Sequence, residues 1–287
     1  MRAALTRKPL FVLLFAAACA GVALLALALA LVLGLDWDGI RIELERSRRL
    51  AYVAAGAALP GTPDLQALDK RLAADGLTLG APVFIRIFKL EFELELWMKR
   101  GDKFYLFATY PICRWSGGLG PKLREGDWQA PEGFYTVDAK ALNPNSRWHR
   151  AFNLGFPNIL DQAHGRTGSY LMVHGGCSSI GCYAMTDPVV DEVWRIVTAA
   201  LKRGQRRFHV HVFPFRLTEE NLAQRRSRPW SAFWRDLKPG YDLFEAARLP
   251  PRISVCKGRY VVSPGTAEGA EDTAVDGACR NTTGSGS

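Results

Sequence analysis

The sequence predicts a mixed α/β fold that is mainly β and follows an N-terminal hydrophobic segment. From Leu90 to Leu96, apolar residues occupy every second position and glutamates lie between them, which is the pattern of a strand with one face in water. Further segments of strand character occur before and after one stretch, Asp187 to Lys202, that predicts a helix. The predicted core therefore consists mostly of strands.

The N-terminal segment from Pro9 to Leu35 carries no charged residue. A helix of about 27 residues spans roughly 40 Å, more than the ~30 Å hydrocarbon core of a bilayer. Basic residues precede it at Arg2, Arg7 and Lys8, and they favour a cytoplasmic N-terminus. We expect an uncleaved transmembrane helix that anchors a periplasmic protein to the inner membrane. Cleavage as a signal peptide is the alternative, and both imply export.

The remaining elements are expected in a defined order. A helix from Ile40 to Ala58 comes first, and a shorter one follows it from Asp64 to Ala74, because an aspartate caps the free N–H groups of a first turn. The Gly- and Pro-rich segment 116–133 predicts a long surface loop. Strands are expected at 83–88, 90–97, 104–111, 134–137, 170–174 and 208–213, a helical stretch after Pro214, and a hairpin at 253–262 that turns at Lys257-Gly258.

These elements divide the chain into five parts. We expect a membrane anchor or signal segment at 1–38, a juxtamembrane helical spacer at 39–81 and a mainly β domain at 82–214 that contains the cysteine- and histidine-bearing segment 174–183. A helical and hairpin extension at 215–262 and a disordered tail at 263–287 complete the chain, because small and polar residues dominate after Pro264.

The charge of the chain indicates its surroundings. The formal net charge is +9 and 48% of the residues are hydrophobic, so a buried core is expected together with anionic neighbours such as lipid headgroups or wall polymers. Nucleic acid is not expected as a partner, because no zinc-finger, RRM or helix-turn-helix pattern occurs and export separates the chain from the genome.

The segment from His174 to Tyr183 combines an imidazole, two thiols and three glycines. A cysteine nucleophile needs a neighbouring base, because the thiolate is the attacking species and a free thiol is mostly protonated at neutral pH. Cys182 is the candidate nucleophile and His174 the candidate base, and thiol labelling of Cys182 below pH 7 is expected to depend on His174. Gly181 lets a substrate approach closely and frees the N–H of Cys182 to stabilise an oxyanion.

Two other interpretations of these residues stay open. The cysteines of exported proteins are mostly disulfide partners, so Cys113 and Cys177 are interpreted as buried or disulfide-bonded, and Cys256 and Cys279 as a possible second pair. A zinc site is the other alternative. It would combine three residues of the segment with a further histidine, namely His174, Cys177 and Cys182 with His164, His209 or His211.

Five more polar residues have a structural interpretation. His209 and His211 share one face of a strand and are interpreted as core or surface histidines. Asp161, Arg166 and Lys122 could meet a charged substrate, but we interpret them as solvated loop residues.

At the same segment the sequence resembles the L,D-transpeptidase catalytic family, also called YkuD-like, and within it the YafK branch. His174 begins the family pattern, and the run Ser179-Ile180-Gly181-Cys182 completes it. The family's second histidine is replaced by Ile180, and Ala184 stands where an Arg or Asn is usual. Further segments similar to the branch run in order from about Leu59 to Val262.

The resemblance implies a bent mixed β-sheet with Cys182 at the rim of a cleft and a helical C-terminal extension. Cys182 would be the nucleophile and His174 the general base and acid, with the imidazole oriented by the carbonyl of Gly175. Gly181 would supply an oxyanion N–H group together with Cys182, and Ser179 and Tyr183 would shape the site. No cofactor and no metal are implied.

The implied substrate is the stem peptide of peptidoglycan, attacked at the L-centre carbonyl of meso-diaminopimelate to form a thioester on Cys182. An amine acceptor would make this a transpeptidase. With water as acceptor it would be an amidase or carboxypeptidase that releases a wall-linked outer-membrane lipoprotein or a terminal residue. A non-catalytic wall-binding protein of the same fold is the rival from another class.

Overall fold

The computed structural model describes residues 36–267, 274–277 and 279, together with four isolated N-terminal positions. The chain divides into two compact units, 1–43 and 44–287. None of the helices in the described part of the chain has the length and apolar composition needed to cross a bilayer. The expected membrane anchor at 1–38 falls almost wholly outside the described residues.

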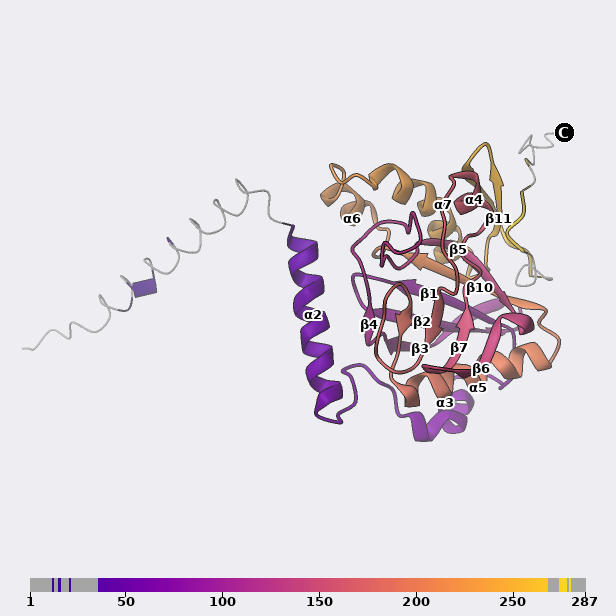
Figure 1. Cartoon of the computed structure of the whole chain (residues 1–287). Coiled ribbons are helices and arrows are strands. Elements are labelled where there is room, and N and C mark those ends of the chain that lie inside the picture. The colour runs from indigo at the N-terminus through magenta and orange to yellow at the C-terminus, as the bar shows by residue number, and fades with distance from the viewer. Residues whose placement is uncertain are drawn as a thin grey trace, which may run out of the picture. The chain divides into compact units, whose positions relative to one another are not determined.

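The second unit contains two five-stranded sheets. The one with the longer strands, called the larger sheet, forms the core (Figure 1). Its strand order is β3-β2-β1-β10-β5; β1 and β10 are parallel, and the other neighbours are antiparallel. The strands are β1 (Val83–Phe88), β2 (Glu93–Arg100), β3 (Lys103–Pro111), β5 (Gly133–Asp138) and β10 (Arg207–Phe213). All six residues of β1 are buried, as expected for a central strand covered on both faces.

The second sheet carries the segment that the sequence singles out. Its order is β4-β9-β8-β7-β6, and β8 and β9 pair in parallel. The strands are β4 (Arg114–Trp115), β6 (Leu142–Ser146), β7 (His149–Asn153), β8 (Met172–His174) and β9 (Tyr183–Ala184). The candidate catalytic loop, 175–182, therefore connects two adjacent strands.

Two helices contact strands of the second unit. The helix α5 (Asp187–Lys202) contacts β7 of the smaller sheet and β1 of the larger one, and α7 (Ser231–Ala247) contacts the hairpin strand β12 (Arg259–Ser263). The helices are α2 (Trp37–Ala54), α3 (Leu68–Ala74), α4 (Ile159–Ala163), α5 (Asp187–Lys202), α6 (Glu219–Gln224) and α7 (Ser231–Ala247), with short 3-10 turns η1 (Leu65–Ala67) and η2 (Ala139–Ala141) and a hairpin of β11 (Arg252–Cys256) and β12 (Arg259–Ser263).

Most expected elements are present, and the mainly β prediction is confirmed. The helix α5 has the bounds that the sequence predicts, and Asp64 caps η1 by accepting from the N–H of Gln66. The strand expected at 90–97 is displaced, because Phe92 has a left-handed φ of 55° and the chain turns there before β2 begins.

The expectation of a surface loop at 116–133 is wrong in part, because Lys122 and Ala130 are buried and Glu132 is fully buried. The tail expected from 263 lies largely outside the described residues. At its described positions, Cys279 forms a disulfide with Cys256, and Val255 donates to the carbonyl of Asp276 at 2.8 Å.

A buried ion pair fixes the 116–133 loop. Lys89 Nζ lies 2.9 Å from Glu132 Oε1, and both side chains are fully buried. Lys89 also donates to the carbonyls of Gly120 and Ala130, whereas Glu132 accepts from the Gly120 N–H and from the Trp234 indole. Since buried charges are tolerated only when their hydrogen-bonding capacity is met, these contacts tie the loop to the β1–β2 turn and to α7.

The histidine pair on β10 belongs to the core. His209 and His211 face the same side, with ring centroids 5.6 Å apart, and both are buried. The His211 ring packs edge-on against Phe84 and Phe134. Burial lowers the pKa of His211 well below its usual value, and the nearby His209 and Arg86 act in the same direction. The core interpretation of both histidines is confirmed.

This burial predicts an acid-dependent loss of stability. Because the folded-state pKa of His211 lies below the unfolded value of about 6.5, the unfolded state binds the proton first, and stability present above that pH is lost as the pH falls. We expect His211→Leu to reduce the slope of unfolding free energy against pH, below pH 6.5, by up to about 1.4 kcal/mol per pH unit. Urea denaturation of both proteins between pH 4.5 and 7.5 measures this, and parallel curves would contradict it.

Candidate active site

The parallel pairing of β8 and β9 brings His174 and Cys182 to one face of the smaller sheet. Val173 is in register with Tyr183 and His174 with Ala184, so Met172 lies opposite Cys182. Side chains alternate along a strand, and the side chains of His174, Met172 and Cys182 therefore share a face. The N–H of Met172 donates to Cys182 Sγ at 3.4 Å, which agrees with this register.

A cavity of about 780 Å³ lies over this face and is lined by both candidate catalytic residues. Its wall also includes Lys122, Trp148 and Tyr170. Cys182 is half-buried and is the free cysteine of the described chain. The structure thus places the predicted nucleophile and base in one cavity.

One ring nitrogen of His174, Nδ1, is hydrogen-bonded to the backbone, and the other is available as a base. Its Nδ1 lies 2.5 Å from the carbonyl oxygen of Gly175, and a carbonyl accepts, so Nδ1 carries the proton and Nε2 carries the lone pair. The contact expected of Gly175 is present. Burial lowers the pKa of His174, partly offset by this hydrogen bond, which keeps the imidazole neutral at pH 7.

The thiol of Cys182 is protonated in the resting site. Its Sγ donates to the carbonyl of Tyr170 at 3.6 Å and accepts from Met172, and these are its hydrogen bonds within the described residues. Burial raises the pKa of Cys182, against smaller lowering effects of the Met172 N–H and of Lys122. Labelling of Cys182 below pH 7 therefore requires that the thiol give up its proton, and its dependence on His174 stays a prediction.

Because both groups are neutral at rest, attack by the thiol would require its proton to move. The thiol would have to leave the Tyr170 carbonyl and turn to His174 Nε2, and hydrogen bonds of this kind often tighten only with substrate bound. The arrangement has the two groups that a nucleophile with a general base needs.

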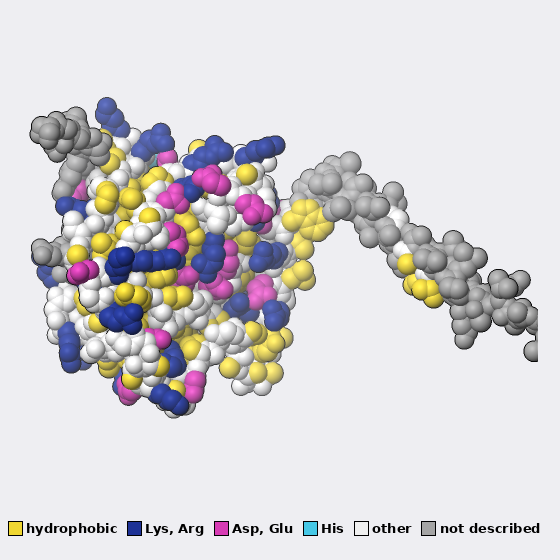
Figure 2. Space-filling view, turned by 180° about the vertical axis from the view of Figure 1, so that it is seen from behind, with side chains coloured by type: hydrophobic (Ala, Val, Ile, Leu, Met, Phe, Trp, Pro, Cys, Tyr) yellow, Lys and Arg dark blue, Asp and Glu magenta, His cyan; other side chains and the backbone are white. Residues whose placement is uncertain are grey.

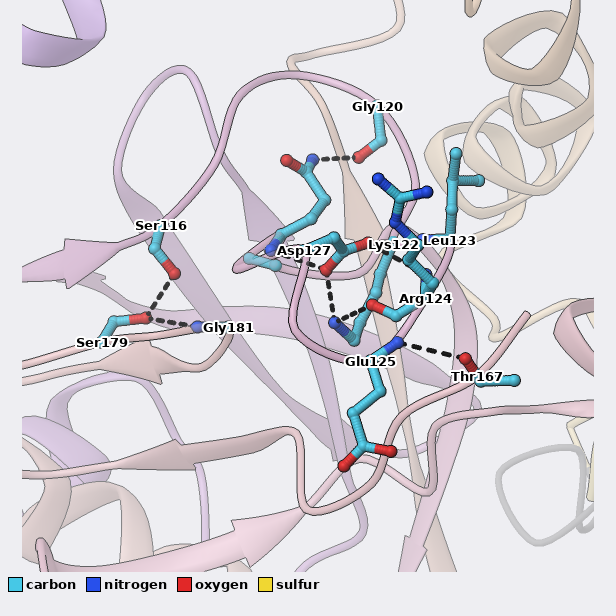
Figure 3. Close-up of polar contacts among 12 residues, drawn as sticks. Ser116, Gly120, Lys122, Leu123, Arg124, Glu125, Asp127, Thr167, Ser179 and Gly181 are labelled. Atoms are coloured by element: carbon cyan, nitrogen blue, oxygen red, sulfur yellow. Dashed lines mark hydrogen bonds and ion pairs between the residues drawn. The ribbon is translucent and has the colours of Figure 1, made fainter.

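The turn before Cys182 is held by Ser179. Its hydroxyl donates to the carbonyl of Cys182 at 2.7 Å. It also accepts from the N–H of Gly181 at 3.2 Å and lies 3.1 Å from the hydroxyl of Ser116 (Figure 3). This geometry agrees with a turn-stabilising role. It also occupies the Gly181 N–H, so in this arrangement the N–H of Cys182 is the better oxyanion donor of the two predicted ones.

Gly181 itself permits a close approach. Its φ is +135°, and a Cβ atom there would lie 3.0 Å from Leu171 Cδ1. Tyr183, the next residue but one, faces the opposite side: it is buried and its hydroxyl donates to the carbonyl of Pro131 at 2.7 Å. Tyr183 therefore shapes the site through packing and lies outside the cavity wall.

A disulfide and an aspartate hold the rest of the catalytic loop. Cys113 and Cys177 are bonded, which joins the chain before β4 to the loop 175–182. Asp187, at the start of α5, accepts from the N–H of Gly176 at 2.7 Å. Disulfides in both pairs confirm that interpretation of the cysteines.

The predicted zinc site is wrong, because two of its proposed ligands are bound to other groups. Cys177 is committed to Cys113, and His164 Nε2 contacts the carbonyl of Gly258 at 2.8 Å. Within the described part of the chain, no three His, Cys, Asp or Glu side chains are grouped as metal ligands. The solvated-loop interpretation of Asp161 and Arg166 is also wrong, because they are buried and form an ion pair at 2.7 Å.

Trp148 is a site residue that the sequence reasoning missed. It lies in the turn between β6 and β7, lines the cavity and stacks on the imidazole of His174, with centroids 6.3 Å apart and planes at 26°. The indole thus lies beside a base that is itself buried. No local motif marks this role, because Trp148 and His174 are brought together only by the pairing of β7 with β8.

Comparisons with known proteins identify the family of the chain. A family model, the YkuD L,D-transpeptidase catalytic domain, matches residues 93–212. The Escherichia coli (strain K12) protein YafK is 52% identical over 185 residues, which cover 64% of this chain and 75% of that protein, and the same values hold for YafK of Escherichia coli O157:H7.

Two solved structures are more distant. Pgp2, the helical cell shape determining protein of Campylobacter jejuni, in its K307A mutant form, is 19% identical with a TM-score of 0.39; the match covers 64% of this chain and 66% of that one. Bd1075 of Bdellovibrio bacteriovorus is also 19% identical, with a TM-score of 0.33 over 57% of this chain and 60% of that one. On the sequence match, the chain belongs to the L,D-transpeptidase catalytic domain family, and it is similar to YafK within it.

The stacked indole leads to a prediction about the base. Trp148→Ala should raise the pKa of His174 toward its usual value of about 6.5, because burial is the main cause of its lowering. An NMR titration of the His174 ring signals measures this shift. Trp128→Ala removes a different indole from the same cavity wall and serves as the matched control. An unchanged His174 pKa in Trp148→Ala would contradict the shielding role.

Proposed function

We propose that the protein is a peptidoglycan-modifying cysteine enzyme that acts through a thioester on Cys182. The observation that carries the proposal is the cavity shared by the free thiol of Cys182 and the oriented imidazole of His174. Membership of the L,D-transpeptidase family supports the substrate class, which is the stem peptide of the cell wall.

The reaction follows from the protonation states. Cys182 gives its proton to His174 Nε2 while the sulfur attacks the carbonyl carbon at the L-centre of meso-diaminopimelate, and the N–H of Cys182 faces the developing oxyanion. The amide C–N bond breaks, and His174 returns the proton to the leaving amine. A thioester remains on Cys182.

The acceptor then decides the product. An incoming amine gives transfer, whereas water gives hydrolysis, including release of a peptide or lipoprotein linked to the wall. In both cases His174 takes a proton from the acceptor as it attacks the thioester carbonyl, and the Cys182 thiol is regenerated.

We also propose that the protein works outside the cytoplasm, anchored to the inner membrane by its N-terminal segment. Two disulfides support an oxidising compartment, and the uncharged run before Asp36 supports export. On the face in Figure 2, basic and acidic side chains are interspersed.

The proposal predicts that Cys182→Ala lowers turnover by at least about a thousand-fold, because no other group supplies the thioester. Purified sacculi are digested with the protein and the products identified by mass spectrometry, which separates new cross-links from released peptides. The double variant Cys256→Ala/Cys279→Ala, which removes cysteines outside the cavity, should retain activity. Wild-type turnover by Cys182→Ala would refute the cysteine mechanism, and no turnover by any form would favour a wall-binding protein.

A further inference from the structure

Lys122 is a buried cation in the wall of the catalytic cavity. Its exposed fraction is 4%, and it lines the same cavity as His174 and Cys182. The solvated-loop interpretation of this residue is therefore wrong. The other cation of the cavity wall is Arg147, which lies on the exposed β6–β7 turn, so Lys122 is the one held in place by its surroundings.

The ammonium group of Lys122 is positioned by two acceptors. Nζ donates to the carbonyl of Arg124 at 2.9 Å and to Asp127 Oδ1 at 2.5 Å (Figure 3). An ammonium has three N–H donors, and these two bonds are its described ones. One donor of a buried, cavity-lining ammonium is therefore left for a ligand.

Asp127 does not depend on Lys122 for its hydrogen bonds. Its carboxylate also accepts from the backbone N–H groups of Leu123, Arg124 and Gln129, at 2.9, 3.0 and 3.0 Å. The loop itself thus satisfies this carboxylate. A lysine that only completed this turn would add little to the hydrogen bonds of Asp127. The burial of Lys122 in the cavity wall therefore needs another explanation.

The opposite wall is built around the lysine side chain. Gly168 has a φ of +138°, and a Cβ there would lie 2.7 Å from Lys122 Cε. Only glycine leaves this space open. The segment that makes room for Lys122 continues directly to Tyr170 and Met172, whose backbone groups contact the thiol of Cys182.

The charge of Lys122 affects the pKa of the candidate nucleophile. It lowers the pKa of Cys182, against the larger opposite effect of burial. Because Lys122 and Cys182 line the same cavity, an anion bound to the free donor of Lys122 would share that cavity with the bond that Cys182 attacks.

We propose that Lys122 binds a carboxylate of the acyl donor, close to the scissile amide. This inference rests on the proposed function and adds a specificity-determining residue to it. The ligand class is a peptide with a free carboxylate near the attacked carbonyl. In a stem peptide such a carboxylate can belong to the second centre of diaminopimelate, on the acyl side, or to the residue that leaves.

The test uses three synthetic stem peptides: one with both carboxylates free, one amidated on the acyl side and one amidated on the leaving residue. In the wild type, one of the two amidations should lower kcat/KM by about 10- to 100-fold, the value of a hydrogen bond to a charged group. Lys122→Met should lose the same factor on the free peptide and nothing further on that amide. The amide that shows this coupling identifies the carboxylate.

Controls separate this role from a structural one. Lys238 pairs with Asp242 at 2.6 Å on α7, and Lys238→Met, which removes a comparable ion pair elsewhere, should keep the full preference for the free carboxylate. Lys122→Arg should restore part of the preference. The comparison of peptides in the wild type needs no variant, so it decides the question even if Lys122→Met does not fold.

Two results would overturn the inference in different ways. Equal kcat/KM for all three peptides in the wild type, or an unchanged penalty for amidation in Lys122→Met, would refute carboxylate binding by Lys122 while leaving the Cys182 chemistry intact. Failure of the wild type to turn over any of the peptides would refute the proposed function and this inference together.

Discussion

The buried ion pair of Lys89 and Glu132 is the constraint on which the geometry of the site depends. Each charge is out of water, and removing one partner from such a pair leaves an uncompensated charge that typically costs 3 to 5 kcal/mol. Glu132 is also bound by the indole of Trp234 and by the N–H of Gly120. The helical extension after Pro214 is therefore part of the support of the catalytic domain, because α7 holds the loop that carries Lys122.

The site combines a firmly held loop with a nucleophile that is not yet hydrogen-bonded to its base. A disulfide at Cys177, the carboxylate of Asp187 and the hydroxyl of Ser179 hold the loop 175–182 from three sides. Within that frame the thiol of Cys182 donates to the Tyr170 carbonyl and not to His174. Burial keeps both reacting groups neutral, which limits reaction with solvent-borne electrophiles until a substrate enters the cavity.

The sequence predicts this fold well where the pattern is local. Period-two alternation locates β2, β3 and β10 within a few residues, and the bounds predicted for α5 are those observed. The sequence pattern does not predict the short strands β6 and β7. The residues of β6 are Leu-Asn-Pro-Asn-Ser, which do not alternate between apolar and polar. It is a strand only through its pairing with β7, a tertiary effect that propensity does not contain.

For the site, too, the sequence predicts residues that are close along the chain and misses those that only the fold brings together. Cys182, His174 and Ser179 lie in one segment, so their proximity is readable from spacing and from the family resemblance. Trp148 and Lys122 reach the cavity from loops that are 26 and 52 residues before His174. Lys122 looks like a solvated residue in a Gly- and Pro-rich loop, and its burial depends on contacts with Asp127 and with the distant Gly168.

The central claim is that Cys182, activated by His174, carries the acyl group. Intact-protein mass spectrometry after rapid mixing with a stem tetrapeptide tests it most directly. The account predicts a mass increase equal to the acyl fragment, located on the peptide that contains Cys182, with its rate of formation strongly reduced in His174→Ala. Substrate turnover with no adduct on Cys182 in the wild type, and an undiminished rate in Cys182→Ala, would contradict it.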